Sequence, residues 1–144
     1  MIGFDLSEDH LSVESLVREL VAKEVAPNIA EQDARHFFDR TILKKMAETG
    51  LLGICIPGEH GGAGFDYISL GLACEELEYG DTSLRVIMSV HVGLNGLTLL
   101  SWGTADQKAR YLAPQSKGLK IASFGMTEPD AGSDGGSNLA HARC

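Results

Sequence analysis

The stretch of sequence that decides the fold is "DTSLRVIMSVHVGLNGLTLLSW", which runs from Asp81 to Trp102. We expect a helix that begins near Asp81 or Thr82 and runs to about Trp102, with apolar side chains on nearly every side. A helix of this kind belongs in the middle of a bundle. Gly93 and Gly96 each disfavour a helix by about 1 kcal/mol relative to alanine, so their presence predicts close approach by another helix or a ligand. The apolar residues are Leu84, Val86, Ile87, Met88, Val90, Val92, Leu94, Leu97, Leu99 and Leu100.

Helical patterns also precede this central stretch. Val13, Leu16 and Val17 begin a series at three- and four-residue steps, which predicts a helix with one apolar face. Pro27 lacks a backbone donor and should kink or restart this helix. The caps and stops that we expect are Asp5 or Ser7 before the first helix, Gly50 after a helix over residues 40–49, and Asp66 before a helix over residues 67–79.

After the central stretch the pattern changes from helix to strand. Thr104 and Gln107 have the spacing of a capping box, which predicts one more helix, and Pro114 should end it. The segment "LKIASFGM", residues 119–126, is typical of a strand, and "TEPDAGSDGGSN" after it is typical of a loop. We therefore expect a mainly α chain, with an N-terminal helical domain over residues 1–117 and the incomplete beginning of a β-domain over residues 118–144.

Composition limits the partners and the compartment. The chain has 20 acidic and 12 basic residues, a net charge of −8, which argues against nucleic acid and an anionic membrane surface as partners. The start "MIGFDLSEDH" lacks the features of a signal peptide, and we expect no apolar stretch to reach the length of a membrane span. Cys55, Cys74 and Cys144 have no CxxC spacing, so we expect reduced thiols in a cytoplasmic protein, with neither a disulfide nor a metal site.

Three features have a simpler interpretation than a functional one. The glycine run over residues 58–64 lacks both the Lys-Ser/Thr of a phosphate loop and the third glycine of a dinucleotide fingerprint, which favours a structural turn. Glu75, Glu76 and Glu78 are one to three residues apart, which favours solvated residues or ion pairs over an acid–base pair. His91 lies in the apolar stretch and is interpreted as a hydrogen-bonded core residue.

The polar loop near the end of the chain is the strongest candidate site. A strand that delivers Thr127, Glu128, Asp130 and Ser133 into one loop, together with successive backbone amides, makes a polar edge. Such an edge suits the amide-like rim of a flat heterocycle, or a phosphate. As a pattern alone it is more often a turn, because turns are rich in Asp, Gly and Ser.

The chain resembles the acyl-CoA dehydrogenase family over residues 1 to about 134. Three blocks carry the resemblance in the family's order: "GLLGICIPGEHGGAGFDY", "EELEYGDTSLRVIMSVHVGLN", and "WGTADQKARYLAPQSKG" followed by "SFGMTEPDAGSD". The resemblance implies an N-terminal helical domain, a middle β-domain and a C-terminal helical bundle. It also implies FAD, an acyl-CoA substrate, electron-transfer flavoprotein as acceptor, a homo-oligomer, and a role in fatty acid or amino acid catabolism.

The resemblance also implies roles for single residues. In the family the segment that matches the polar loop lines the flavin, with the position of Thr127 near the pyrimidine edge and that of Ser133 at the CoA part of the substrate. Members that act on glutaryl-CoA hold the distal carboxylate with an arginine and a serine at the spacing of Arg85 and Ser89. For Arg85 the simpler interpretation is a side chain that extends from the helix start toward water. The residues assigned to the flavin are Phe124, Gly125, Met126, Thr127, Glu128, Pro129, Asp130, Ala131, Gly132 and Ser133, and those assigned to the substrate are Ser133, Arg85 and Ser89.

No catalytic residue is expected within this chain. The family's glutamate base, which takes the α-proton of the acyl-CoA, comes from segments beyond residue 144. After Asp134 a member continues through β-strands, whereas this chain reads "GGSNLAHARC". We therefore interpret it as an N-terminal fragment or frameshifted product that is inactive alone. A non-catalytic helical interaction module, and an acyl-CoA oxidase or flavin monooxygenase of the same fold, remain as alternatives.

Overall fold

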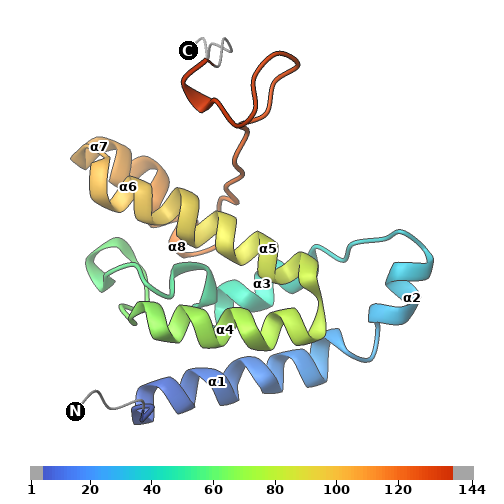
Figure 1. The fold of residues 1–144 in the computed structure, drawn as a ribbon. Helices are drawn as coiled ribbons and strands as arrows, with labels where there is room; N and C mark the ends of the chain where they lie inside the picture. Colours follow the sequence, from blue (N-terminus) through green and yellow to red (C-terminus); the bar gives the residue numbers. More distant parts are fainter. Residues whose placement is uncertain (1–4, 138–144) are drawn as a thin grey trace.

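The structure is a computed structural model that describes residues 5–137, and this part of the chain forms packed helices followed by an irregular C-terminal segment (Figure 1). The expectation of a mainly α fold is confirmed. The α-helices are α1 (Glu8–Leu20), α2 (Ile29–Ala34), α3 (Thr41–Glu48), α4 (Tyr67–Gly80), α5 (Thr82–Met88), α6 (Leu97–Trp102), α7 (Ala105–Gln107) and α8 (Ala113–Ser116). Wider π-helical turns cover Val21–Val25, Ser89–Gly96 and Lys108–Leu112, and 3-10 turns cover Leu51–Gly53, Gly58–His60 and Gly135–Ser137.

The starts of α1 and α4 are joined by hydrogen bonds. Ser7 Oγ accepts a hydrogen bond from the backbone N–H of His10 at 3.2 Å, so Ser7, and not Asp5, caps α1. His10 Nε2 lies 2.9 Å from Asp66 Oδ2, and Asp66 Oδ1 accepts a hydrogen bond from the N–H of Ser69 at 2.9 Å. Asp66 therefore caps α4, as predicted, and also connects it to α1. The two helices pack along each other (Figure 1).

The hydrophobic core lies between α1, α3, α4 and the central helix. Val13 and Val17 are buried as the apolar pattern of α1 predicts, whereas Leu16 is 40% exposed. Each fully buried aliphatic side chain contributes about 1.5–3 kcal/mol to folding. The core residues include Val13, Val17, Leu20, Ile42, Met46, Leu51, Leu52, Ala73, Leu77, Leu84, Met88 and Val92.

The central helix is continuous from Thr82 to Trp102, as predicted, and consists of α5, a π-helical turn and α6. Leu84 and Met88 are buried on its inner face, but Val86 is 41% and Leu94 is 48% exposed. The expectation that this helix lies in the middle of a bundle is therefore correct for one face only. Its other face is open to solvent in the part of the chain that the structure describes.

The length of the central helix corrects one expectation. It has 21 residues with a mean hydropathy of 1.3, which is enough to cross a membrane by length and composition alone. The prediction that no apolar stretch reaches this length is therefore wrong. In the structure the helix has a different role, because it packs against α4 and carries a buried, hydrogen-bonded His91.

The strand predicted at residues 119–126 does not form within the described residues. The segment leaves the helices as an irregular chain (Figure 1), and the nearest bridge, between Glu128 and Ala131, lies beyond it. A strand needs hydrogen bonds to a neighbouring strand, so an apolar segment alone cannot form one. Gly118, with a φ of 67°, turns the chain into this segment, and a Cβ there would lie 2.3 Å from Ala47 Cβ.

Pro114 does not end the last helix, contrary to the prediction. It lies in the first turn of α8, and the helix continues to Ser116. Proline has no N–H to give to the carbonyl of Arg110, four residues earlier. Lys120 Nζ donates to that carbonyl instead, at 2.9 Å. The helix tolerates Pro114 because another donor replaces the one that proline lacks.

The glycine run over residues 58–64 is a structural turn, as predicted. The turn is held by backbone hydrogen bonds, such as the one from the N–H of Ala63 to the carbonyl of Gly53 at 2.9 Å. A Cβ on Gly62 would lie 2.0 Å from the carbonyl oxygen of Ile56. Two backbone segments therefore approach each other at a distance that only glycine permits.

Replacing Gly62 should destabilise the fold. Gly62→Ala places a methyl group against the Ile56 carbonyl, so we expect a loss of about 1–3 kcal/mol in the free energy of unfolding, measured by urea denaturation. Gly58→Ala is the matched control, because a Cβ at Gly58 meets no atom within 4 Å. Equal losses in the two variants would contradict this account of the turn.

Candidate functional site

The candidate flavin-facing residues form one loop, called here the rim segment (residues 124–133). It projects from the helices at the C-terminal end of the described chain (Figure 1). The N–H of Glu128 donates to the carbonyl oxygen of Ala131 at 2.7 Å, and the N–H of Ala131 donates back at 3.4 Å. These two hydrogen bonds close a tight turn. The structure therefore brings the ten predicted residues together in a single exposed loop.

The rim segment has the groups that one side of a flat heterocycle needs. Phe124 is 54% and Met126 is 44% exposed, so an aromatic ring and a polarisable thioether are available for contact. A Cβ on Gly125 would meet no atom within 4 Å, which leaves room for a ligand beside the backbone. Thr127 adds a hydroxyl next to these groups. The segment can therefore hold one face and one edge of a flavin ring.

His91 anchors the chain just before the rim segment. Its side chain is 1% exposed, its Nδ1 accepts a hydrogen bond from the N–H of Ala122 at 3.0 Å, and its Nε2 donates to the carbonyl of Gln115 at 3.1 Å. An amide N–H can only donate, so Nδ1 carries no proton in this arrangement. Burial lowers the pKa of His91 below its ordinary value of 6.5, which favours the neutral ring. The prediction of a hydrogen-bonded core histidine is confirmed.

Two amide side chains hold the same segment one residue further along. Asn95 Nδ2 donates to the carbonyl of Ser123 at 3.4 Å, and Gln115 Nε2 donates to Asn95 Oδ1 at 3.3 Å. Gln115 Oε1 is buried without a hydrogen-bond partner among the residues that the structure describes. We call His91, Asn95 and Gln115 the clamp. It joins the central helix, α8 and residues 122–123.

Arg85 and Ser89 each have a local partner. Arg85 Nε donates to Glu78 Oε2 at 2.5 Å, and Ser89 Oγ donates to the carbonyl of Val86 at 3.0 Å. The hydrogen bond from Arg85 lowers the pKa of Glu78. An exposed ion pair of this kind contributes little to stability, so a ligand carboxylate could compete with Glu78 for Arg85.

The acidic residues of α4 form ion pairs or face solvent, as predicted. Glu76 Oε1 lies 2.6 Å from Arg18 Nη2 of α1, and this pair bridges the two packed helices. Glu75 is exposed, and Glu78 pairs with Arg85. None of these contacts places two carboxylates across a substrate-sized gap.

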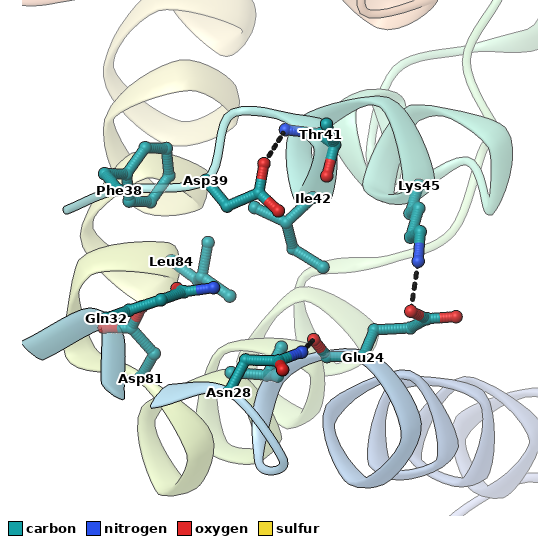
Figure 2. Close-up of a pocket in the computed structure, with 11 residues that line it drawn as sticks. Glu24, Asn28, Gln32, Phe38, Asp39, Thr41, Ile42, Lys45, Asp81 and Leu84 are labelled. Carbon is teal, nitrogen blue, oxygen red and sulfur yellow. Dashed lines mark hydrogen bonds and ion pairs between the residues drawn. The ribbon is translucent and has the colours of Figure 1, made fainter. Parts of the chain in front are cut away.

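The pocket in Figure 2 does not suit the predicted ligands. Its cavity volume of about 70 Å³ is well below the roughly 300 Å³ at which ligand pockets begin. Its polar groups are largely paired with each other, since Lys45 forms an ion pair with Glu24 and Asp39 accepts a hydrogen bond from the N–H of Thr41. The labelled lining residues are Glu24, Asn28, Gln32, Phe38, Asp39, Thr41, Ile42, Lys45, Asp81 and Leu84. A larger groove of about 720 Å³ lies beside Leu119 and Ile121, but the rim segment does not line it.

Both described cysteines are free thiols. Cys55 is buried, its Sγ donates to the carbonyl of Asp66, and burial raises its pKa to about 11. Burial also raises the pKa of Cys74. Cys144 lies outside the described residues.

The clamp is the part of the site that the sequence did not reveal. His91 was recognised as a buried residue, but its partners are 24 and 31 positions away. Asn95 and Gln115 are 20 positions apart, and this spacing matches no motif that would predict a contact between them. Two features of the sequence could have pointed to the clamp. His91 and Asn95 are polar residues in an otherwise apolar helix, and the backbone N–H and carbonyl groups of residues 122–123 need hydrogen-bond partners.

The family model described as "Acyl-CoA dehydrogenase, N-terminal domain" matches residues 7–118. The chain therefore belongs to the acyl-CoA dehydrogenase family, as the resemblance predicts. It is 40% identical, over 136 residues, to the short-chain specific acyl-CoA dehydrogenase of Clostridium acetobutylicum, and this alignment covers 94% of this chain and 36% of that protein.

Solved structures have the same fold over nearly the whole chain. A structure described as the electron transferring flavoprotein of Acidaminococcus fermentans matches with a TM-score of 0.91 and 39% identity, covering 94% of this chain and 36% of that one. A glutaryl-CoA dehydrogenase from Mycobacterium smegmatis in complex with FADH2 matches with a TM-score of 0.85 and 32% identity, covering 92% of this chain and 34% of that one. The chain therefore spans about a third of the length of the proteins that it matches.

His91 should make stability depend on pH. In the unfolded chain its imidazole titrates near 6.5, whereas in the folded chain burial lowers the pKa. Between the two pKa values the unfolded state binds more protons, so the free energy of unfolding should fall as the pH drops below about 6.5. The fall is at most about 1.4 kcal/mol per pH unit for one group. We expect the urea midpoint, followed by circular dichroism from about pH 7 to 5, to fall less in His91→Asn than in the wild type. Parallel curves for the two proteins would contradict this role of His91.

Proposed function

We propose that this chain is the N-terminal part of an FAD-dependent acyl-CoA dehydrogenase. The enzyme would remove two hydrogens from the α and β carbons of an acyl-CoA thioester. The observation that supports this most is the exposed rim segment, whose residues carry the family resemblance and present an aromatic ring, a thioether and a hydroxyl in one loop. The FADH2 complex of the Mycobacterium smegmatis structure supports FAD as the cofactor.

In this proposal the rim segment binds and orients the flavin. Bound FAD supplies the acceptor for the hydride that leaves the β carbon. Thr127 would lie near the pyrimidine edge of the ring, where its hydroxyl and the backbone donors of the loop would stabilise negative charge that develops there. Phe124 and Met126 cover apolar ring surface and exclude water, and Ser133 contacts the CoA part of the substrate. A glutamate outside this chain takes the α-proton.

The wider assignment follows from the same family. The acceptor is electron-transfer flavoprotein, which the match to the Acidaminococcus fermentans structure supports. The complete enzyme is a homo-oligomer that acts in fatty acid or amino acid catabolism. The free thiols of Cys55 and Cys74 favour the cytoplasm, a reducing compartment.

Flavin content tests the proposed function directly. The full-length protein that contains this chain should purify yellow and reduce an artificial electron acceptor when butyryl-CoA is added. In this proposal the base and most of the flavin site come from outside the 144-residue chain, so this chain alone should show no turnover. A folded full-length protein that is colourless and does not bind added FAD would contradict the proposal.

A uniform, flavin-free oligomer would instead support a helical interaction module, for which the exposed Val86 and Leu94 provide an apolar surface.

A dicarboxylic acyl-CoA is the second candidate substrate, and Arg85 is the observation that favours it. Its ion pair with Glu78 uses Nε, and no hydrogen bond within the described residues engages its two terminal nitrogens. Those two nitrogens can bind a carboxylate with two parallel hydrogen bonds. Ser89, one helical turn further along, would supply a hydroxyl once it releases the Val86 carbonyl.

Substituting Arg85 separates the two substrates. In the full-length enzyme, Arg85→Gln should lower kcat/KM for glutaryl-CoA by at least about tenfold, the equivalent of one charge-assisted hydrogen bond, and change butyryl-CoA turnover little. Arg85→Lys keeps the charge but loses the planar fork, so it should fall between the wild type and Arg85→Gln. If Arg85→Gln lowered kcat/KM equally for both substrates, this would contradict a role of Arg85 in binding the distal carboxylate and indicate only a structural role as the partner of Glu78.

A further inference from the structure

The clamp fixes the chain immediately before the rim segment. His91 and Asn95, one helical turn apart on the central helix, contact Ala122 and Ser123 respectively. Phe124, the first residue of the rim segment, follows directly. A displacement of residues 122–123 would therefore move the start of the rim segment with it.

The groups of the clamp can make these contacts in one arrangement only. His91 Nδ1 must accept from the N–H of Ala122, which requires the proton to be on Nε2, and Nε2 then donates to the carbonyl of Gln115. Asn95 must donate through Nδ2 to the carbonyl of Ser123 while its Oδ1 accepts from Gln115. Gln115 thus orients both other members, one through its backbone and one through its side chain.

The remaining contacts of the segment favour this role. The Lys120 ammonium, two residues before Ala122, donates to the carbonyl of Arg110 and lies 5.0 Å from the centre of the Tyr111 ring. Leu119, 76% exposed, and Ile121, 47% exposed, bury little apolar surface. Apolar packing therefore contributes little. The backbone N–H groups of Leu119 and Lys120 donate to the Pro114 carbonyl at 2.9 and 3.3 Å, and the hydrogen bonds with His91 and Asn95 hold the two residues next to the rim segment.

We propose that His91, Asn95 and Gln115 are positioning residues that set the rim segment for flavin binding, with His91 Nδ1 as the decisive acceptor. This inference rests on the proposed function, because it assumes that the rim segment contacts FAD. The three residues touch neither flavin nor substrate. They act through Ala122 and Ser123.

Two substitutions of His91 distinguish a role in positioning the rim segment from a role in stabilising the fold alone. An asparagine side chain places its oxygen near the position of Nδ1, so His91→Asn keeps the acceptor for Ala122 and loses the donor to Gln115. A glutamine side chain reaches the position of Nε2, so His91→Gln keeps the donor to Gln115 and loses the acceptor. Each variant loses one buried hydrogen bond. If His91 only stabilised the fold, the two variants should therefore have similar effects on hydrogen exchange and on FAD binding.

The experiment uses the full-length protein with two readouts. Hydrogen–deuterium exchange of the apoprotein over residues 119–126 should be about 2- to 10-fold faster in His91→Gln than in the wild type, the range expected for one hydrogen bond, and within about twofold in His91→Asn. The Kd for FAD, from quenching of flavin fluorescence, should rise by a similar factor in His91→Gln only. Both variants should have similarly lowered melting temperatures.

A variant of the half-buried Asn95 provides a second test. Asn95→Asp keeps the acceptor for Gln115 and replaces the donor to Ser123 with an oxygen, so it should also speed exchange and weaken FAD binding. Equal Kd values for His91→Asn and His91→Gln, or faster exchange with an unchanged Kd, would overturn the inference while the proposed function stands. A wild-type protein that binds no FAD would overturn both.

Discussion

A buried imidazole with two fixed hydrogen bonds connects the helical part of this protein to its candidate site. His91 lies in the central helix at 1% exposure, and its two ring nitrogens hold α8 on one side and the segment before the rim on the other. Burying an unpaired polar group costs about 1–3 kcal/mol, so the partners of His91 are needed as well as useful. The position of the loop is therefore coupled to the packing of the core.

The core supports this arrangement through the same helix. Leu84 and Met88 pack toward α4, and α4 is joined to α1 through Asp66 and His10. The opposite face of the central helix, with Val86 and Leu94, is exposed in the described part of the chain. The central helix therefore keeps an exposed apolar surface.

Local rules predicted most of the helices, because caps and stops act within a few residues. Ser7, Asp66 and Thr104 begin helices, and the residues that end them could be recognised except at Pro114. There the donor that replaces the missing N–H comes from Lys120, ten residues from Arg110. The prediction of a strand at residues 119–126 was wrong for a related reason, because a strand needs a hydrogen-bonded partner strand elsewhere in the chain. The clamp could not be predicted because its contacts join residues 20 to 31 positions apart. Family resemblance located the rim segment, but the contacts that hold it required the structure.

In the proposed function, residues 124–133 form one wall of a flavin site and the clamp sets its position. A crystal structure of the full-length protein with FAD tests this claim most directly. Our account predicts that the isoalloxazine ring lies against the rim segment, with Thr127 near its pyrimidine edge and the hydrogen bond from Ala122 to His91 Nδ1 intact. A flavin bound elsewhere, with residues 124–133 turned away from it, would contradict the account.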